Sequence, residues 1–304
     1  MKVLVTGGAG FIGSHIVDRL LGENCAVVVV DNLSTGRSSN INPAARFIEM
    51  DIRNPQLLDM FTIEQFDYVI HLAAQTMVPK SLEAPDYDCQ INILGTINVL
   101  EACRKTKIKR VIFSSTAATY GNTACIPVTE QVATEPTSFY GLSKLTVEKY
   151  LVLYHQIYGL DYVVLRYANV YGERQGDAGE GGVISIFIRK ISNGQPITIF
   201  GDGGQTRDFV YAGDVANANY QALLTPGANA VYNISTQTET SVNTLVELIG
   251  KISGKAVEKV NSTPRDGDIY RSSLSNVLAK STLSWQPQMA LLDGLFKTYH
   301  FFKK

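Results

Sequence analysis

The sequence of 304 residues has no long hydrophobic run and no excess of charge of either sign. No stretch approaches the ~20 apolar residues that a membrane-spanning helix requires, and the first apolar run, Val3 to Val5, is too short for a signal-peptide core. Lysine and arginine number 27 and aspartate and glutamate 28, without the basic stripe of a nucleic-acid-binding protein. We therefore expect neither a membrane segment nor a nucleic-acid partner.

Cysteine and histidine are also scarce, with four of each. The cysteines form no Cys-x-x-Cys pair, which predicts reduced thiols in a cytoplasmic protein rather than disulfides. Neither residue type shows the spacing of a metal site, and no metal is expected. The residues concerned are Cys25, Cys89, Cys103, Cys125, His15, His71, His155 and His300.

Apolar segments alternate with helical patterns through the first half of the sequence. Strands are expected at residues 2–6, 26–30, 46–50, 66–72, 110–115 and 161–166, and helices at 11–21, 91–104 and 140–158. Continuous valine and isoleucine runs between helices are typical of a parallel sheet covered on both faces. This series predicts a doubly wound α/β fold of the Rossmann type.

The second half is less regular and predicts a smaller α/β domain that packs directly on the first. Residues 172–182 are rich in glycine and charge and predict a long loop. Short strands are expected at 197–200 and 206–210, and helices at 213–224 and 242–252, the last with Ser241 as its N-cap.

A glycine-rich segment, residues 6–13 (TGGAGFIG), joins the first expected strand to the first expected helix. Glycines permit a tight turn and let backbone N–H groups approach a pyrophosphate, and the helix N-terminus adds positive partial charge. Asp31 ends the second strand, where its carboxylate can bind the adenosine ribose hydroxyls and repel a 2′-phosphate. The pattern therefore favours NAD over NADP, although Arg37 nearby weakens that preference; a glycine turn without a ligand is the alternative.

Residues after the next two strands extend the expected cofactor site. Asp51 and Ile52 can edge the adenine, and the small residues of Leu72-Ala73-Ala74 permit close approach to the pyrophosphate. For each of these taken alone, an ordinary loop is the alternative interpretation.

Tyr140-Gly-Leu-Ser-Lys144 opens a strongly helical stretch, and the i, i+4 spacing places both named side chains on one helix face. A tyrosine titrates near ~10, so it needs a lysine ammonium and a cationic nicotinamide ring to act as a base at neutral pH. The preceding strand ends in Ser114-Ser115-Thr116, and Thr116 can donate to a substrate hydroxyl or relay its proton. The alternatives are exposed helix residues and a strand-end threonine with backbone partners.

Six features occur in order with characteristic spacings: TGGAGFIG, Asp31, HLAA, FSSTAATYG, YGLSK and LRYANVYG. In these features the sequence resembles the extended short-chain dehydrogenase/reductase superfamily, in its nucleotide-sugar branch. The resemblance covers almost the whole chain and is strongest to the UDP-glucose 4-epimerase family.

The resemblance implies that Tyr140 is the catalytic base and acid, that Lys144 tunes it and binds the nicotinamide ribose, and that Thr116 is the catalytic hydroxyl residue. It implies an NAD-binding domain over residues 1–168, together with 212–236, and a nucleotide-sugar-binding domain over 169–211 and 237–304. The residues expected at the cofactor are Gly7, Gly10, Phe11, Ile12, Gly13, Asp31, Asn32, Ser34, Thr35, Gly36, Asp51, Ile52, Leu72, Ala73, Ala74, Asn92, Ser114, Tyr140, Lys144 and Tyr167.

For the substrate, the resemblance implies a diphosphate bound near Asn169 and by two arginines, whose guanidinium groups suit bidentate phosphate contacts. It also implies a uracil flanked by Val183 and Phe200 and a uridine ribose on Asp268. Surface roles are the alternative for the arginines. The residues expected at the substrate are Thr116, Tyr140, Asn169, Val183, Phe200, Arg207, Arg265, Asp268 and Ser272.

The residues after Thr116 narrow the reaction. Related 4,6-dehydratases carry Asp-Glu there and decarboxylating relatives keep a Glu, whereas this sequence has Ala117-Ala118. Without a second acid–base pair, a 4-keto sugar can only take hydride back, which predicts NAD-dependent 4-epimerisation of a UDP-sugar with NAD tightly bound and regenerated. The alternatives are another nucleotide-sugar epimerase or dehydratase, acting on a UDP-uronate or dTDP-sugar, and a non-catalytic NAD-sensing regulator.

Two further implications concern the substrate range and assembly. Ser272 stands where some family members carry a bulky tyrosine, so room for an N-acetyl group is expected and UDP-GlcNAc and UDP-GalNAc join UDP-glucose and UDP-galactose as candidate substrates. A plain loop serine is the alternative. The resemblance also implies a homodimer through a four-helix bundle of the helices at 91–104 and 140–158.

Overall fold

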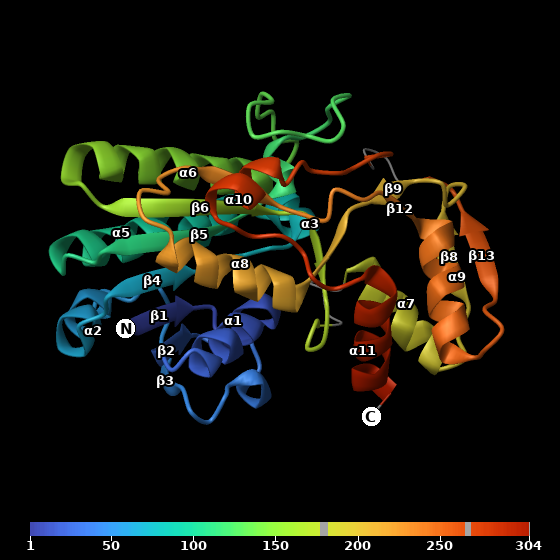
Figure 1. Cartoon of the computed structure of the whole chain (residues 1–304), viewed down its shortest axis with the longest axis horizontal. Helices are drawn as coiled ribbons and strands as arrows, with labels where there is room; N and C mark the ends of the chain where they lie inside the picture. Colours follow the sequence, from blue (N-terminus) through green and yellow to red (C-terminus); the bar gives the residue numbers. More distant parts are fainter. Residues whose placement is uncertain (177–181, 265–268, 304) are drawn as a thin grey trace.

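The computed structural model describes residues 1–176, 182–264 and 269–303. Its main feature is a seven-stranded parallel sheet in the order β11-β6-β5-β4-β1-β2-β3 (Figure 1). The strands are β1 (Lys2–Thr6), β2 (Ala26–Asp31), β3 (Arg46–Glu49), β4 (Tyr68–His71), β5 (Arg110–Thr116), β6 (Asp161–Tyr167) and β11 (Val231–Ile234). The order reverses between β1 and β4, which is the switch point where doubly wound sheets bind ligands. The predicted Rossmann fold is confirmed.

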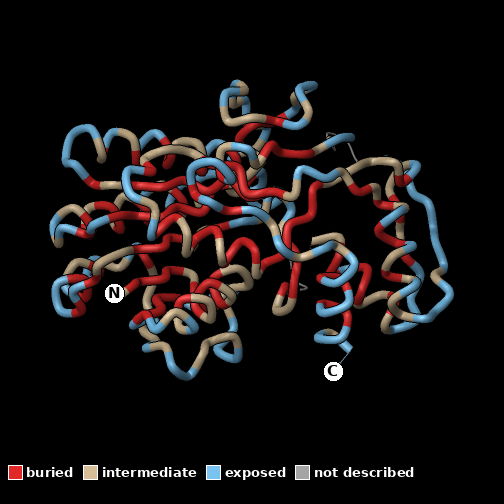
Figure 2. Tube along the Cα trace, viewed as in Figure 1, coloured by how far each residue is buried: buried red, intermediate tan, exposed pale blue. Residues whose placement is uncertain are grey.

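Helices cover both faces of this sheet because successive strand residues point to opposite sides. In β1, Val3 and Val5 join the core beneath one helix layer, and Leu4 joins the core beneath the other. The first layer is α1 (Phe11–Gly22) and α8 (Ala212–Leu224), and the second is α2 (Leu57–Glu64), α5 (Thr96–Lys105) and α6 (Phe139–Tyr158). Figure 2 shows the central strands of the sheet as buried between these layers.

The chain between β4 and α5 is less regular than predicted. It forms α3 (Val78–Glu83), α4 (Pro85–Cys89) and a π-helical turn, η2 (Gln90–Gly95). A single regular helix was expected over residues 91–104. The wider π turn replaces its first part and turns the side chain of Asn92 into the protein, where it is 2% exposed.

A second group of elements lies beside the carboxyl end of the sheet, at the right of Figure 1. It comprises α7 (Val183–Ser192), β8 (Ile197–Phe200), α9 (Val242–Ser253), β13 (Lys259–Ser262) and α11 (Leu291–Lys303). These helices share a separate hydrophobic core that includes Ile188, Leu245 and Leu295. Ser241 caps α9 as predicted, since its hydroxyl accepts from the N–H of Thr244 at 3.0 Å.

The remaining elements are short: η1 (Ser38–Asn40), η3 (Ala117–Thr119), β7 (Asn169–Tyr171), β9 (Thr206–Arg207), β10 (Phe209–Tyr211), β12 (Thr240–Ser241) and α10 (Val277–Thr282). The strand expected at 206–210 is divided at Asp208. Its buried carboxylate accepts from the N–H of Thr236 (2.8 Å), the N–H of Gln237 (3.0 Å) and the hydroxyl of Ser273 (3.2 Å). On the two sides of Asp208, β9 pairs with β12 and β10 pairs with β7.

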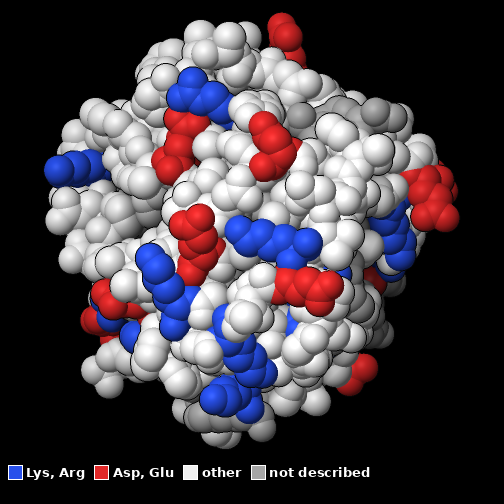
Figure 3. All heavy atoms as spheres, turned by 90° about the vertical axis from the view of Figure 1, so that its right-hand side faces the viewer, with Lys and Arg blue, Asp and Glu red and all other residues white. Residues whose placement is uncertain are grey.

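The described residues include no helix long and apolar enough to cross a membrane, and no group of three metal-ligating side chains occurs among them. Figure 3 shows the end of the molecule formed by the second group, where basic and acidic side chains are interspersed. Among the described residues on that face, the view shows no broad patch of one sign.

Candidate active site

A cleft of about 770 Å³ lies at the carboxyl ends of the central strands. The predicted residues that line it are Gly7, Gly10, Phe11, Ile12, Gly13, Asp31, Asn32, Ser34, Thr35, Asp51, Ile52, Leu72, Ala73, Ala74, Ser114, Thr116, Tyr140, Lys144, Tyr167 and Asn169. The structure thus gathers most of the expected cofactor and catalytic residues in one place. Arg265 and Asp268 lie outside the described residues.

The glycine loop forms one wall of this cleft with very little room for side chains. Gly7 has a φ of +72°, and a Cβ there would lie 2.7 Å from the backbone nitrogen of Ala73. A Cβ on Gly13 would overlap the carbonyl oxygen of Gly7. α1 begins directly after Gly10 and points its N-terminus into the cleft, so the loop has the shape and polarity of a pyrophosphate cradle.

Asp31 is fixed by the backbone at the end of β2. Its Oδ2 accepts from the N–H of Ala9 at 3.0 Å and its Oδ1 from the N–H of Leu33 at 2.8 Å. Burial raises the pKa of this carboxyl, and these two hydrogen bonds oppose the rise. Gly36 does not line the cleft but lies against Asp31, because a Cβ there would be 2.8 Å from Oδ1.

Asp51 occupies the far end of the cleft beside Asn32. Its carboxylate accepts from Nδ2 of Asn32 at 2.9 Å and from Nε and Nη2 of Arg53 at 2.9 and 2.8 Å. The hydrogen bonds from Arg53 are the main reason that the pKa of Asp51 is lowered to about 2. Asp51 is therefore an anion at this end of the cleft.

The catalytic candidates lie at the other end, where α6 meets β5. Ser138 caps α6 by accepting from the N–H of Gly141 at 3.1 Å. Lys144 is 4% exposed, and its Nζ donates to the carbonyl oxygen of Ser114 at 2.9 Å. Burial lowers the pKa of Lys144 to about 8. It therefore remains largely cationic at neutral pH, beside Tyr140 and Thr116 in the cleft wall.

A buried hydrogen-bond chain behind this wall determines the state of His71. The hydroxyl of Thr96 donates to the carbonyl oxygen of Asn92 at 2.6 Å. A hydroxyl has one proton, so Thr96 must accept from Nε2–H of His71, at 2.9 Å. Nδ1 then accepts from the hydroxyl of Thr6 at 2.6 Å, and that hydroxyl accepts from the N–H of Ala73 at 3.3 Å. Burial lowers the pKa of His71 to about 3, so the ring is neutral.

Asn92 belongs to the same buried framework. Its Oδ1 accepts from the N–H of Gln75 at 2.8 Å, and its Nδ2 donates to the carbonyl oxygen of Gln75 (2.9 Å) and to Oγ of Ser143 (3.0 Å). Ile91, the preceding residue in η2, lines the cleft instead. Asn92 therefore joins the loop after β4 to α6 from behind the cofactor wall.

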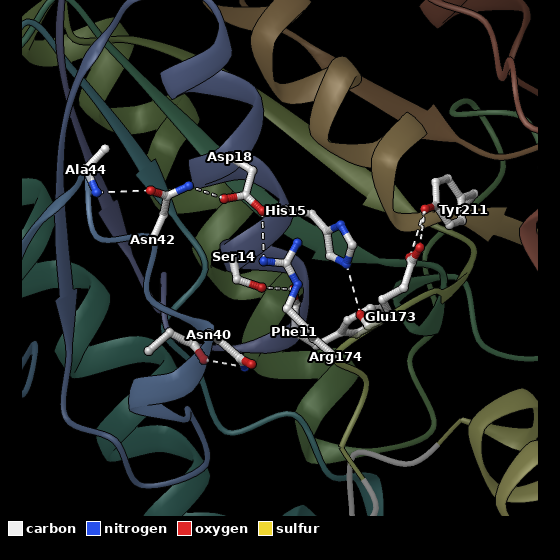
Figure 4. Close-up of polar contacts among 11 residues, drawn as sticks. Phe11, Ser14, His15, Asp18, Asn40, Asn42, Ala44, Glu173, Arg174 and Tyr211 are labelled. Atoms are coloured by element: carbon white, nitrogen blue, oxygen red, sulfur yellow. Dashed lines mark hydrogen bonds and ion pairs between the residues drawn. The ribbon is translucent and has the colours of Figure 1, made fainter. Parts of the chain in front are cut away.

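Figure 4 shows how the loop after β7 is fastened to α1. Nη1 of Arg174 lies 2.8 Å from Oδ2 of Asp18, and Nε2 of His15 lies 2.9 Å from the carbonyl oxygen of Glu173. The carboxylate of Glu173 also accepts from the hydroxyl of Tyr211. These contacts hold the loop against the helix whose first turn faces the cleft.

The remaining expected substrate residues in the described structure are not part of the cleft lining, although Val183 directly follows the lining residue Gly182. Val183, Phe200, Arg207 and Ser272 are all partly exposed, and none of them lines it. Nη1 of Arg207 donates to the carbonyl oxygens of Thr206 (2.8 Å) and Ile269 (2.7 Å).

Several residues that line the cleft were not expected there from the sequence. They are Gln75, Thr76, Met77, Val78, Lys80, Tyr87, Ile91 and Gln175. The first two follow Leu72-Ala73-Ala74 directly, so their position after the same strand end could have indicated them. Lys80 and Tyr87 come from α3 and α4, and the ammonium of Lys80 lies 4.7 Å from the centre of the Tyr87 ring.

Comparisons with known proteins agree with this geometry. The NAD dependent epimerase/dehydratase family matches residues 3–235. A putative UDP-glucose 4-epimerase from Methanocaldococcus jannaschii is 49% identical over 302 residues, covering 99% of this chain and 98% of the relative.

Two crystal structures of UDP-glucose 4-epimerases superpose over the whole chain. The Thermotoga maritima enzyme with UDP-glucose has a TM-score of 0.97 at 44% identity, and the Thermus thermophilus enzyme in complex with NAD has 0.94 at 39% identity. In both cases the match covers 100% of this chain and 99% of the other. The chain therefore belongs to the NAD-dependent epimerase/dehydratase family, in its UDP-glucose 4-epimerase branch.

Proposed function

We propose that this protein is an isomerase that interconverts UDP-glucose and UDP-galactose by NAD-dependent epimerisation at C4. One observation carries the choice of reaction. Asp31 and Asp51 are the only carboxylate residues among the described residues that line the cleft, and Asp51 marks the end remote from Tyr140. Among the described residues, no aspartate or glutamate lines the cleft beside Tyr140, Lys144 and Thr116, so the acidic pair that would dehydrate a 4-keto sugar is missing there.

The residues of this chain supply the proton chemistry and the orientation. Tyr140 removes the proton of the C4 hydroxyl and later returns it, while the ammonium of Lys144 stabilises the phenolate. Thr116 donates a hydrogen bond to the reacting oxygen. The bound NAD supplies the acceptance and return of hydride at C4, for which Gly7, Gly13 and Asp31 provide the fitted binding wall.

A Tyr140→Phe variant tests this assignment. We expect epimerase activity to fall by about 10² to 10⁴-fold, because the general base is lost while the fold remains. Bound NAD should stay near the wild-type content, since the glycine loop is untouched. Tyr68→Phe, at the amino end of β4 and away from the cleft, is the matched control. Full 4-epimerase activity in Tyr140→Phe would contradict the mechanism.

The products formed distinguish an epimerase from the alternative activities. An epimerase converts UDP-glucose to UDP-galactose with no added acceptor and without net accumulation of NADH. A simple dehydrogenase accumulates NADH, a dehydratase leaves a deoxy-keto product, and an NAD-sensing regulator gives no product. Separation of the sugar nucleotides after incubation distinguishes these four outcomes.

Acceptance of the N-acetyl sugars is part of the proposal and rests on Ser272, a partly exposed residue beside the buried Ser273. A small side chain there leaves room for a C2 substituent. Ser272→Tyr should therefore reduce turnover of UDP-GlcNAc far more than that of UDP-glucose. Equal loss on both substrates would reject this gate.

The division of labour along the chain is also proposed. Residues 1–168 and 212–236 would bind NAD, and residues 169–211 and 237–304 the UDP-sugar. The separate core of α7, α9 and α11 supports this division.

The absence of a disulfide among Cys25, Cys89, Cys103 and Cys125 is compatible with a cytoplasmic location.

A homodimer is supported by an apolar stripe on the outer face of α6. Leu142, Leu153 and Ile157 are 48%, 50% and 65% exposed, and Leu94 of the adjoining η2 is 56% exposed. Large apolar side chains gathered on one surface are typical of an interface. Sedimentation should show a dimer for the wild type and a monomer for Leu153→Glu/Ile157→Glu. A monomeric wild type would refute the assembly.

A further inference from the structure

One face of α6 carries three chemically important residues rather than two. Tyr140, Lys144 and Glu148 follow at i, i+4 and i+8, a spacing that aligns them along the helix. Tyr140 and Lys144 reach the cleft, whereas Glu148 lies deeper and is 3% exposed. No step of the proposed reaction uses Glu148.

Glu148 joins three elements of the fold through one carboxylate. Its Oε1 accepts from the hydroxyl of Ser115 in β5 at 2.6 Å and from Nε of Arg166 in β6 at 3.0 Å. Its Oε2 accepts from Nη2 of Arg166 at 2.5 Å. The side chains of Glu148 and Arg166 are 4% and 5% exposed, so both charges are withdrawn from water and depend on each other.

Ser115, the residue of β5 that binds Glu148, is next in sequence to two residues of the catalytic site. Ser115 stands between Ser114, whose carbonyl accepts from Lys144, and Thr116. A shift of α6 along β5 would therefore move Lys144 and the hydroxyl of Thr116 relative to each other.

The arginine extends the same framework to the chain after Thr116. The guanidinium of Arg166 lies 4.6 Å from the centre of the Tyr120 ring. Tyr120 follows η3 directly and donates its hydroxyl proton to Oδ1 of Asn233 at 2.8 Å. The next residue after Arg166, Tyr167, bonds the hydroxyl of Ser114 at 2.9 Å.

Stability alone does not account for such a pair. A buried ion pair can often be replaced by apolar residues of similar size without loss of stability, because desolvation offsets the attraction between the charges. The pair favours one arrangement of α6, β5 and β6, because any other arrangement would leave a charged side chain unpaired in the interior.

We propose that Glu148 and Arg166 are positioning residues for catalysis, which fix α6 against β5 so that Tyr140 and Lys144 face Thr116. This inference rests on the proposed epimerase activity. It adds that Tyr140, Lys144 and Thr116 need the buried ion pair to hold them in position for full activity. Neither residue touches the cleft, so the effect reaches the substrate only through the groups they hold.

The pair also contributes to the charge around Lys144. Asp88 from α4 and Glu148 from α6 both raise the pKa of the Lys144 ammonium against the effect of burial, and His71 from β4 is neutral. A neutral residue at 148 removes one of these anions and leaves Arg166 as an uncompensated cation. Lys144 should then lose its proton at lower pH.

The experiment compares Glu148→Gln with the wild-type holoenzyme and with Glu23→Gln, which breaks the half-exposed Arg19–Glu23 pair at the end of α1. In Glu148→Gln we expect kcat for UDP-glucose to fall by roughly tenfold or more, as misplaced catalytic groups produce. KM and bound NAD should change less than twofold, and the basic limb of the kcat profile should move to lower pH. Glu23→Gln should match the wild type in every measurement.

A second variant guards against a simple folding defect. Glu148→Met/Arg166→Met keeps apolar bulk without either charge, and we expect it to fold while kcat stays low. Wild-type kcat in this folded double variant would overturn the proposal, and so would an unchanged pH profile in Glu148→Gln. An inactive wild type would contradict the proposed function instead, so the two failures are distinguishable.

Discussion

Lys144 should make the folded protein less stable at neutral pH, although we propose that it is essential for activity. Lys144 is 4% exposed, and the pKa of its ammonium falls from 10.5 to about 8 because burial disfavours the charged form. That difference corresponds to roughly 3 kcal/mol of destabilisation while the lysine is protonated. Lys144→Met removes the charge and keeps an unbranched side chain of similar length.

The expected gain is smaller than this because methionine cannot donate to the carbonyl oxygen of Ser114. Loss of that hydrogen bond costs about 1 kcal/mol, so Lys144→Met should be more stable than the wild type by roughly 2 kcal/mol at pH 7. The variant should have lost its epimerase activity. Chemical denaturation of the nucleotide-free proteins measures the difference.

The pH dependence of this stability difference tests whether burial of the Lys144 ammonium is its cause. Below the folded pKa of about 8, both states hold the proton and the full destabilisation is present. Between that value and 10.5, the unfolded state binds a proton that the folded state lacks, so the stability of the wild type rises with pH. The advantage of Lys144→Met should therefore shrink over this window.

Lys109→Met is the control, because Lys109 is an exposed lysine whose side chain is 63% accessible and pairs with Asp67. It should show neither the gain at pH 7 nor its loss at higher pH. If Lys144→Met were less stable than the wild type at pH 7, or if its advantage were the same at every pH, the reasoning from burial would be refuted.

Two further changes test other parts of the site. Gly13→Ala should release bound NAD, measured as nucleotide freed on denaturation, because its Cβ would overlap the Gly7 carbonyl; Gly22→Ala, which meets open space, should retain it. Thr96→Val should lower the free energy of unfolding by about 1–3 kcal/mol in chemical denaturation, because Nε2–H of His71 is left buried without an acceptor. Thr62→Val removes an equivalent but exposed hydroxyl contact and should change stability little, and an equal loss in both threonine variants would contradict the role of the buried chain.

The sequence by itself was sufficient for the features that short segments specify. The strand, glycine turn and helix of residues 1–21 follow in immediate succession, and Asp31 ends the next strand. A dinucleotide site at the carboxyl ends of these strands can therefore be predicted from short, local segments of the sequence. Tyr140 and Lys144 share a face because a helix repeats every 3.6 residues. The absence of acids after Thr116 is likewise visible in the sequence alone.

Only the tertiary structure decided which groups are buried and which partners they have. Ser143 is 51 residues from Asn92 in sequence, and Ser115 is 33 residues from Glu148. No periodicity indicates such pairings, nor the π turn that directs Asn92 inward. The lowered pKa of Lys144 and the neutral state of His71 arise from neighbours brought together by the sheet, because burial and hydrogen bonding depend on distances in space rather than along the chain.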